Sequence, residues 1–388
     1  MARNVAVIGV GNTEYTSAKK EKKGRSELGR ACVKSALDFV GRGLTLSDID
    51  AFYFASADAF EGVQRPERST ECFGQGFATP VYSINTGGTA GGSAFKTAYQ
   101  AVAAGIYNIV IVYGSSSLIS TVDAQQILNS ASPPLIEKPC GAGAIHMGAF
   151  FLTRYQEDYG ITAEDFALVA AKSHKHAAKN PYAHVRKGYT VDQILASPMV
   201  VSPIRLYEVC PVSSGACCVV LASESQAKEL TDTPVWIKAV SSTSNSFTVG
   251  YRPFEGFPML RILAKRLFEK VGIKDPLEEI DYAELFNPFA GFEYLEYEAL
   301  GFCGPGEGPK LVREGITDLG GKLPLNLSGS TLRTNSGVAA SVTRHADTCL
   351  QLMGKVEGER QVKDARVGLA HAWGGNMGQF HTLAVLSR

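Results

Sequence analysis

Apolar and polar residues follow two spacings along the chain, and the spacing changes from one segment to the next. Unbroken apolar runs at 4–10, 51–55 and 108–113 predict strands, and such runs are typical of strands buried on both faces. Between them, apolar residues three or four positions apart predict helices over 26–40 and 90–105. Strands that alternate with helices predict an α/β fold with helices packed on a sheet.

The same order of elements occurs a second time. The phrase Leu-x-x-Ile-Asp, followed by an apolar strand, begins at Leu46 and again at Leu277. The pattern of the second copy predicts strands at 235–240, 282–286, 365–369 and 381–386, and helices at 258–271 and 338–353. We therefore expect two similar halves, one over 1–225 and one over 226–388.

One long segment, 115–202, has no counterpart in the other half. Its pattern predicts helices at 149–159 and 163–179, followed by a polar stretch at 180–189. Long insertions in a compact fold are usually functional. We interpret this segment as an inserted loop domain of the first half, which closes over the substrate or binds it.

Composition narrows the classes of protein. The 388 residues include 38 basic and 38 acidic side chains, and this balance argues against nucleic acid as the main partner. The sequence has no apolar run near 18 residues and no signal-peptide pattern, so we expect no membrane contact and a cytoplasmic location. The eight cysteines form no Cys-x-x-Cys pair, which favours free thiols in a reducing compartment. His174 and His176 are two positions apart and do not share a helix face, so no metal site is predicted.

Three glycine-rich stretches, at 85–94, 326–337 and 368–378, are the candidates for chemistry. The first lies between a predicted strand and a predicted helix. Backbone N–H groups at such a helix start can hold an anion or a developing oxyanion. The alternative is that the glycines allow helix and sheet to pack closely.

The order and spacing of these stretches resemble the thiolase superfamily, in its sterol-carrier-protein-type and archaeal branch, and the resemblance covers essentially the whole chain. The segments 163–167, 179–183 and 300–308 are similar to that branch as well. The resemblance implies a thiolase-like five-layer α/β/α/β/α sandwich built from two similar halves. It also implies a homodimer core.

The residues that carry thiolase chemistry are replaced. Matching Asn85 to the family's nucleophile turn places Gly88 where the family has its cysteine. Phe286 stands at the position of one family histidine, with Asn287 beside it. Ser336 stands at another, or Asn335 if the register shifts by one. Because a thioester-forming mechanism needs a thiolate and a base, ordinary thiolysis is not expected.

A cysteine-less branch of the superfamily is also similar. It comprises retro-aldolases that cleave β-hydroxyacyl-CoA and work with a small OB-fold/zinc-ribbon subunit. Tyr251-Arg252-Pro253 resembles a stretch that carries a catalytic tyrosine there, so Tyr251 is our candidate for proton transfer, although a free tyrosine has a pKa of about 10. The resemblance implies acyl-CoA as substrate, with its coenzyme A part, and no permanently bound cofactor.

Three alternatives stay open. The chain could cleave a β-ketoacyl-CoA, for example an aryl one, by direct attack of free coenzyme A, whose thiol would fill the space at Gly88. It could be a non-catalytic thiolase-like subunit of a complex. It could be a carrier that binds acyl-CoA or lipid without reaction.

The candidate residues fall into two sets. The predicted catalytic set is Tyr251, His371, Asn287, Ser336 and Asn335, and the predicted substrate-binding set is Gly88, Thr89, His146, Met147, Gly374 and Gly375. His371 is expected just after a strand and matches a histidine common in the branch. Tyr251 and His371 have an alternative role as buried structural residues. Three further groups are expected: a phosphate-binding set or solvated helix face (Lys172, Lys175, Lys179, Arg186, Lys187), surface histidines (His174, His176, His184), and an apolar pocket (Leu118, Met147, Phe150, Phe151, Phe254, Phe257, Phe292).

Overall fold

A computed structural model describes residues 2–17, 19–56, 78–117, 128–129, 132–337 and 339–388. The strands are β1 Val5–Asn12, β2 Ala51–Ala55, β3 Val81–Ile84, β4 Ile109–Ser116, β5 Met199–Val201, β6 Ile204–Arg205, β7 Gly215–Ser223, β8 Val235–Ser244, β9 Tyr282–Glu284, β10 Val367–Gly374 and β11 Phe380–Ser387. The longer helices are α1 Arg25–Val40, α2 Ala90–Ala103, α4 Ala144–Tyr159, α5 Ala163–Ala177, α8 Pro258–Val271, α10 Phe292–Ala299 and α13 Ala339–Met353. The shorter helices are α6 Val191–Leu195, α7 Glu224–Leu230, α9 Pro276–Glu279, α11 Gly308–Arg313 and α12 Ser330–Arg333.

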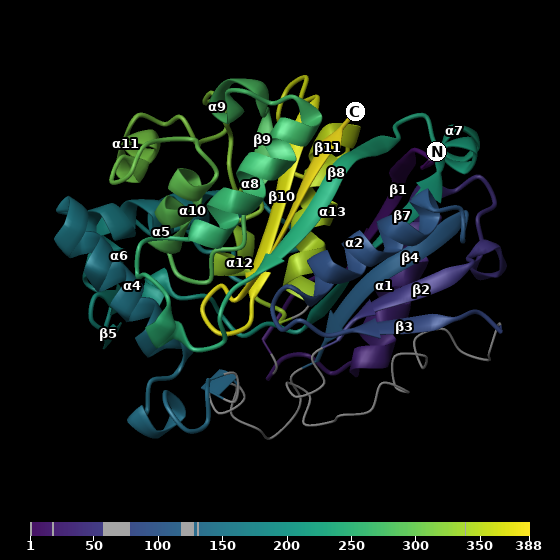
Figure 1. Ribbon diagram of the computed structural model, residues 1–388. Coiled ribbons are helices and arrows are strands. Elements are labelled where there is room, and N and C mark those ends of the chain that lie inside the picture. Colours follow the sequence, from purple (N-terminus) through teal and green to yellow (C-terminus); the bar gives the residue numbers. More distant parts are fainter. Residues whose placement is uncertain (1, 18, 57–77, 118–127, 130–131, 338) are drawn as a thin grey trace.

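Nine of the described strands form one sheet, in the order β3-β2-β4-β7-β1-β8-β11-β10-β9 (Figure 1). The first five come from the first half of the chain and the last four from the second half. The two groups meet where β1 pairs with β8, through only two residue pairs, Ala6 with Trp236 and Val7 with Val235. The boundary between the halves at residue 225 stays a prediction.

Helices α2 and α13 lie in the middle of the molecule and contact strands of both groups (Figure 1). Every described side chain of α13 is buried, as expected for a helix enclosed on all sides. Helix α1 packs on the outer face of the first group, and α8 packs on the outer face of the second. The predicted five-layer α/β/α/β/α arrangement is confirmed.

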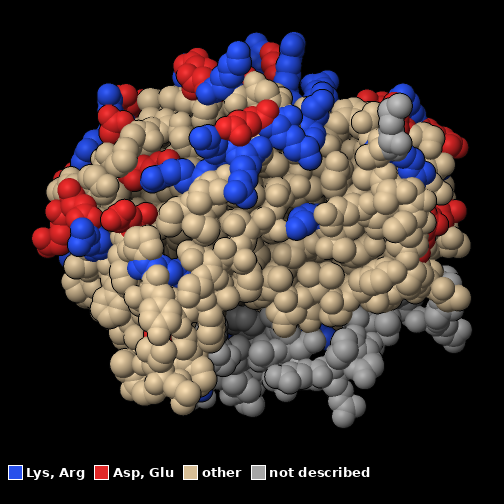
Figure 2. All heavy atoms as spheres, viewed as in Figure 1, with Lys and Arg blue, Asp and Glu red and all other residues tan. Residues whose placement is uncertain are grey.

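Many charged side chains lie on the outside of this sandwich. On the face seen in Figure 2, Lys and Arg are interspersed with Asp and Glu along the upper rim, over α8, α9 and α11, and they form no separate basic surface. No helix in the described part of the chain is both long enough and apolar enough to cross a membrane.

The inserted segment lies beside the second half and carries α4, α5, α6 and β5 (Figure 1). β5 pairs with β6, which follows directly after the segment. Thr162 caps the start of helix α5, and its hydroxyl accepts a hydrogen bond from the Asp165 amide at 3.2 Å. This capping satisfies one of the free N–H groups at the helix start. One face of α5 packs on α11 and α12, so the helix is held between the inserted segment and the second half.

Candidate active site

The first and third glycine-rich stretches meet backbone to backbone. A Cβ added at Gly88 would lie 2.9 Å from the carbonyl oxygen of Trp373 and 3.5 Å from Cζ of Phe286. A Cβ added at Gly374 would lie 2.4 Å from the amide nitrogen of Gly88. Real Cβ atoms do not approach so closely, so glycine is required on both sides.

Two more of the predicted substrate-binding residues belong to this contact. Thr89 is buried at the start of α2, and its hydroxyl donates to the carbonyl of Thr86 at 2.7 Å. Gly375 has a φ of +70°, and a Cβ on Gly87 would lie 2.9 Å from its nitrogen. The structure thus brings Gly88, Thr89, Gly374 and Gly375 together.

Aromatic rings occupy the place where the family carries a nucleophile and a base. The centroids of Phe286 and Trp373 are 5.8 Å apart, and Trp373 also lies 5.7 Å from both Phe257 and Phe292. All four side chains are buried. Position 88 therefore has neither a thiol nor room for one. Cys72 lies outside the described residues.

Asn287 follows Phe286 and is fully buried. Its Nδ2 donates to Oε2 of Glu293 at 2.5 Å, and Nδ2 of Asn326 donates to the same oxygen at 2.8 Å. Lys172 forms an ion pair with the other oxygen of Glu293. Glu293 on α10 therefore orients the side-chain amide of Asn287. The side-chain oxygen Oδ1 of Asn287 has no hydrogen-bond partner among the described residues.

The second glycine-rich stretch leads into α13, beside the start of α2. The amide of Gly91 donates to the hydroxyl of Ser341 at 2.8 Å, which joins the first turns of the two central helices. Ser336 is fully buried, and within the described chain its hydroxyl has no hydrogen-bond partner. Nδ2 of Asn335 donates to Sγ of Cys210 at 3.1 Å. Ser336 therefore offers a free hydroxyl, whereas the Asn335 amide is engaged.

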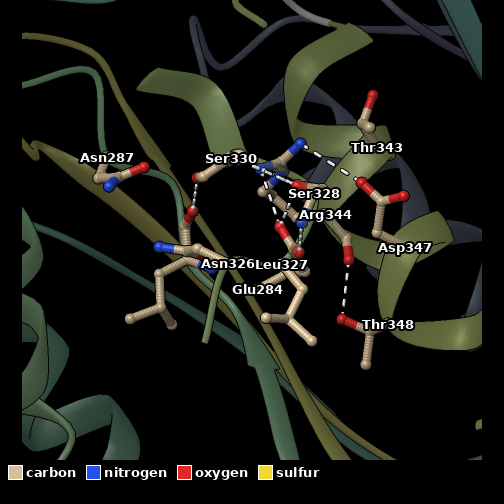
Figure 3. A network of polar contacts seen from close by, with 12 residues as sticks. Glu284, Asn287, Asn326, Leu327, Ser328, Ser330, Thr343, Arg344, Asp347 and Thr348 are labelled. Atoms are coloured by element: carbon tan, nitrogen blue, oxygen red, sulfur yellow. Dashed lines mark hydrogen bonds and ion pairs between the residues drawn. The ribbon is translucent and has the colours of Figure 1, made fainter. Parts of the chain in front are cut away.

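A buried network of ionic and polar contacts holds the start of the second glycine-rich stretch in place (Figure 3). Nη1 of Arg344 donates to Oε2 of Glu284 at 2.9 Å, and the hydroxyl of Ser328 donates to the same oxygen at 2.8 Å. Asn326 accepts the amide of Leu285 at 2.7 Å. Burial and the charge of Glu284 raise the pKa of the nearby Asp347 to about 6. These contacts tie the loop to β9 and α13.

Tyr251 ends a short helical turn, Val249–Tyr251, and 77% of its surface is exposed. The alternative role as a buried structural tyrosine is therefore wrong. The next residue, Arg252, is buried, and its Nη1 donates to the carbonyl of Met377 at 2.8 Å. This bond holds the Tyr251 turn against the third glycine-rich stretch. The role of Tyr251 in proton transfer stays a prediction.

His371 lies inside β10 and not after a strand, because β10 continues to Gly374. Its Nε2 lies 3.1 Å from Nδ1 of His381, and its Nδ1 lies 3.6 Å from Oε1 of Glu296. Burial lowers the pKa of His371 well below its usual value and that of His381 to about 3, so both rings are neutral at pH 7. Burial also raises the pKa of Glu296. His371 therefore belongs to an enclosed polar group, and its role in the site stays a prediction.

His146 and Met147 are adjacent on α4 but face different surroundings. His146 is exposed, whereas Met147 is 4% exposed and belongs to the core. Of the residues expected to line an apolar pocket, Phe151 packs in the core, with its ring 4.9 Å from that of Phe254 and 6.4 Å from that of Phe257, and the pocket itself stays a prediction. Phe150, in contrast, is 53% exposed, and Leu118 lies outside the described residues.

The polar side chains of α5 correct two expectations. His174 and His176 were expected at the surface, but both are buried, and His184 is partly buried. Lys172 is buried against Glu293 and cannot reach a phosphate of coenzyme A. The partners of Lys172 and His174 lie far away in the sequence. The polar residues of α5 therefore show the same local pattern as those of a solvent-exposed helix. Lys175 pairs with Asp318 at 3.2 Å on the outer side.

Sequence reasoning missed α10 altogether. Its sequence, Phe-Glu-Tyr-Leu-Glu-Tyr-Glu-Ala, has charges typical of an exposed helix, yet all eight residues are buried. Glu293 orients Asn287, and Glu296 lies close to His371. In the sequence, the one signal for a role of these two glutamates in the site is that they follow Asn287 by six and nine residues.

Comparisons with known proteins agree with this architecture. Residues 5–225 match the thiolase N-terminal domain, and residues 257–388 match the thiolase C-terminal domain-like family. The chain is 30% identical to an acetyl-CoA acetyltransferase of Methanothermobacter thermautotrophicus over 381 residues, 97% of each chain. It is 29% identical to sterol carrier protein 2 of Bos taurus, over 96% of this chain and 70% of that protein. Among solved structures, the Ltp2-ChsH2(DUF35) aldolase is similar, with a TM-score of 0.84, 26% identity, and coverage of 100% of this chain and 98% of that one.

The chain belongs to the thiolase superfamily. Within it, the chain lies in the branch of the sterol-carrier-protein-type thiolases, as the glycine-rich stretches and the inserted segment predicted. Its general class is that of acyl-CoA acyltransferases and lyases.

Proposed function

We propose that the chain cleaves a bulky β-hydroxyacyl-CoA by a retro-aldol reaction. The observation that carries the proposal is the closure of position 88 by Trp373 and Phe286, because it removes the nucleophile that thiolysis needs. A retro-aldol cleavage needs no covalent intermediate. The likeness to an aldolase over the whole chain supports the same reaction.

The reaction requires a base and hydrogen-bond donors. The base takes the proton of the β-hydroxyl group, the Cα–Cβ bond breaks, and its electron pair moves into the thioester as an enolate. The β-carbon leaves as an aldehyde or ketone, and protonation at Cα gives the shortened acyl-CoA. Tyr251 is the candidate for proton transfer. The free hydroxyl of Ser336 is a candidate donor to the enolate oxygen.

We further propose that coenzyme A enters only as part of the substrate and that a small partner subunit takes part. The similar aldolase, Ltp2-ChsH2(DUF35), carries the names of two components, and the second of these supports a partner for this chain. Leu135, Ile136 and Phe150, all within the inserted segment, are apolar and 91%, 51% and 53% exposed. Exposed apolar groups of this size are typical of surfaces that another chain covers. The OB-fold/zinc-ribbon character of the partner, the homodimer core and the cytoplasmic location remain proposals.

Thiolysis by direct attack of coenzyme A is the second candidate, favoured by the likeness to an acetyl-CoA acetyltransferase. In this reaction the thiol of coenzyme A would lie next to Gly88, where the chain has no side chain. Because the carbonyl of Trp373 and the ring of Phe286 already approach this point, the attacking thiol would have to enter elsewhere. We therefore rank it below the retro-aldol reaction.

The test is a product analysis with the full chain and any small subunit that co-purifies with it. Steroidal and aryl β-hydroxyacyl-CoA are incubated without free coenzyme A, and the matching β-ketoacyl-CoA with it. A ketone or aldehyde together with a shortened acyl-CoA in the first incubation is the expected result. Two acyl-CoA products in the second alone would support thiolysis. No product in either, with the partner present, would favour the non-catalytic subunit.

A further inference from the structure

Arg333, the last residue of α12, is a buried arginine without a carboxylate partner in the described chain. It is 2% exposed, and burial lowers its pKa to about 9. Its Nη2 donates to the carbonyls of Tyr207 at 3.0 Å and Val209 at 3.4 Å, and its Nε has no partner among the residues that the structure describes. The contrast with Arg344 is direct, because that equally buried arginine is paired with Glu284. A buried charge without a counter-ion is unfavourable, and a bound anion would balance it.

His174 does not balance the charge of Arg333. Nη1 of Arg333 donates to Nε2 of His174 at 2.6 Å, so this ring nitrogen is the acceptor and carries no proton. The other ring nitrogen, Nδ1, lies 3.0 Å from the carbonyl of Lys187 and is therefore the N–H donor. Burial and the charge of Arg333 lower the pKa of His174 to about 3. The ring is neutral, and the positive charge stays uncompensated.

Arg333 lines a cavity of about 370 Å³. The rings of Tyr189 and Tyr207 form part of its wall and stack at 4.2 Å between centroids, with 23° between their planes. Val200 and Leu206 lie at its rim, with 41% and 48% of their surfaces exposed. The remaining wall is mostly apolar and includes Ile145, Val185, Val209 and Pro211. This is the size and lining of a small-molecule site with one buried cation.

The cavity adjoins the candidate active site. Cys210 lines it, and Sγ of Cys210 accepts the hydrogen bond from Asn335. Ile145 lines it as well and precedes His146. A group seated in the cavity could therefore belong to a molecule that reaches the site at Ser336.

We propose that this cavity binds the carboxylate of an apolar, ring-containing carboxylic acid, with the carboxylate on Arg333 and the ring beside Tyr189 and Tyr207. One buried cation matches the single charge of a carboxylate, and a phosphate dianion would need more donors than this apolar wall provides. Lys187, whose ammonium lies 5.0 Å from the Tyr189 ring, adds to the positive potential. Resting on the proposed function, the inference makes the substrate an acyl-CoA that also carries a free carboxylate, remote from its thioester.

The test measures binding and needs no turnover. The full chain is titrated by calorimetry with 4-phenylbutyrate and with its neutral analogue, 4-phenylbutyramide. We expect the carboxylate to bind at least tenfold more tightly than the amide, and Arg333→Met to abolish this preference. Equal affinities in the unaltered chain, or a preference that survives Arg333→Met, would overturn the proposal.

A second variant leaves Arg333 in place. Val200→Trp, at the exposed rim, should block the cavity and weaken binding of both probes at least tenfold, whereas Ile106→Trp, at an exposed position outside the cavity lining, should not. Inorganic phosphate and coenzyme A are then added as competitors. Displacement of 4-phenylbutyrate by either at equal concentration would assign the site to a phosphate and overturn the carboxylate.

The two proposals fail separately. Carboxylate binding that depends on Arg333, in a chain that cleaves no β-hydroxyacyl-CoA, would contradict only the proposed reaction. Cleavage of a β-hydroxyacyl-CoA that carries no free carboxylate, at a rate that Arg333→Met does not change, would contradict only the substrate class inferred here.

Discussion

Glu137 and Asn376, 239 positions apart in the sequence, are joined by a hydrogen bond of 2.6 Å from Nδ2 of Asn376 to Oε2 of Glu137. The other carboxylate oxygen accepts the amide of Val249 at 2.5 Å. Glu137 thereby connects the turn that ends at Tyr251 with the third glycine-rich stretch. It is a positioning residue, because it does not itself reach the candidate site.

Replacing Glu137 with Ala should release the Tyr251 turn. Because misplacing a reacting group by about 1 Å can lower a rate by roughly a hundredfold, we expect kcat to fall by about ten- to a hundredfold, with a smaller change in KM. Steady-state kinetics on the substrate identified by product analysis measure this. Glu279→Ala is the control, because Glu279 likewise accepts two backbone amides, of Lys274 and Asp275, on the exposed helix α9. If both variants have the same kcat, the position of the Tyr251 turn does not affect the reaction.

Tyr251→Phe removes only the phenol oxygen from a side chain that is 77% exposed. The fold should therefore be unaffected, with the free energy of unfolding within about 0.5 kcal/mol of the original. If Tyr251 transfers the proton, kcat should fall by a factor of about 10² to 10⁴. Tyr159→Phe, at a tyrosine that is 45% exposed on α4, should leave kcat unchanged. Full activity of Tyr251→Phe would refute the assignment.

Restoring the family's cysteine should not restore thiolysis. In Gly88→Cys the new Cβ would lie 2.9 Å from the Trp373 carbonyl, which is backbone and cannot rotate away. Overpacking of this kind costs roughly 1–3 kcal/mol, so the variant should unfold at a lower temperature. It should also form no covalent acyl-enzyme, as judged by intact-protein mass spectrometry. Gly188→Cys, where no atom lies within 4 Å of the added Cβ, is the matched control. A stable Gly88→Cys that becomes acylated would show that the site can open.

The buried pair of Arg344 and Glu284 should be essential for stability. Removing one partner leaves an uncompensated buried charge, and such changes cost about 3–5 kcal/mol. We expect Arg344→Met to lose this amount in chemical denaturation. The same change at Arg42, which is paired with Asp232 at the surface, should cost less than about 1 kcal/mol. Equal losses would mean that the network in Figure 3 does not hold the loop.

Helices and strands could be predicted from the sequence better than contacts between side chains that are distant in the chain. The periodic helices at 258–271 and 338–353 were found nearly to the residue, because one spacing persists over a dozen positions. The sequence indicated a strand before the first glycine-rich stretch but not its bounds, because the four residues of β3 are too few to show a period. The α10 helix was missed because buried glutamates give the same pattern as exposed ones.

The candidate site could be predicted where glycine is required by close approach, as at Gly88 and Gly374. It could not be predicted where charges find partners across the chain. His174 meets Arg333 159 positions later, and Lys172 meets Glu293 121 positions later. The local sequence around α5 contains no trace of these partners, so its side chains were expected in solvent.

Glu208, beside the wall of the Arg333 cavity, should make stability depend on pH. It is 2% exposed and accepts the amide of Arg205 at 2.7 Å, and burial raises the pKa of its carboxyl group to about 7 from an ordinary value of 4.5. Between these two values the folded chain binds more protons than the unfolded chain. The contribution of this group to stability is therefore full below about pH 4.5 and declines as the pH rises to about 7.

The loss across this window is about 3 kcal/mol at most. Glu208→Gln keeps the acceptor for the Arg205 amide and cannot ionise, so it should remove this part of the pH dependence. Urea unfolding at pH 5 and pH 8 measures it: the unaltered chain should lose more stability between the two values than Glu208→Gln does. Glu27→Gln, at an exposed glutamate that caps α1, serves as the control and should follow the unaltered chain. If Glu208→Gln follows it as well, Glu208 ionises freely in the folded state.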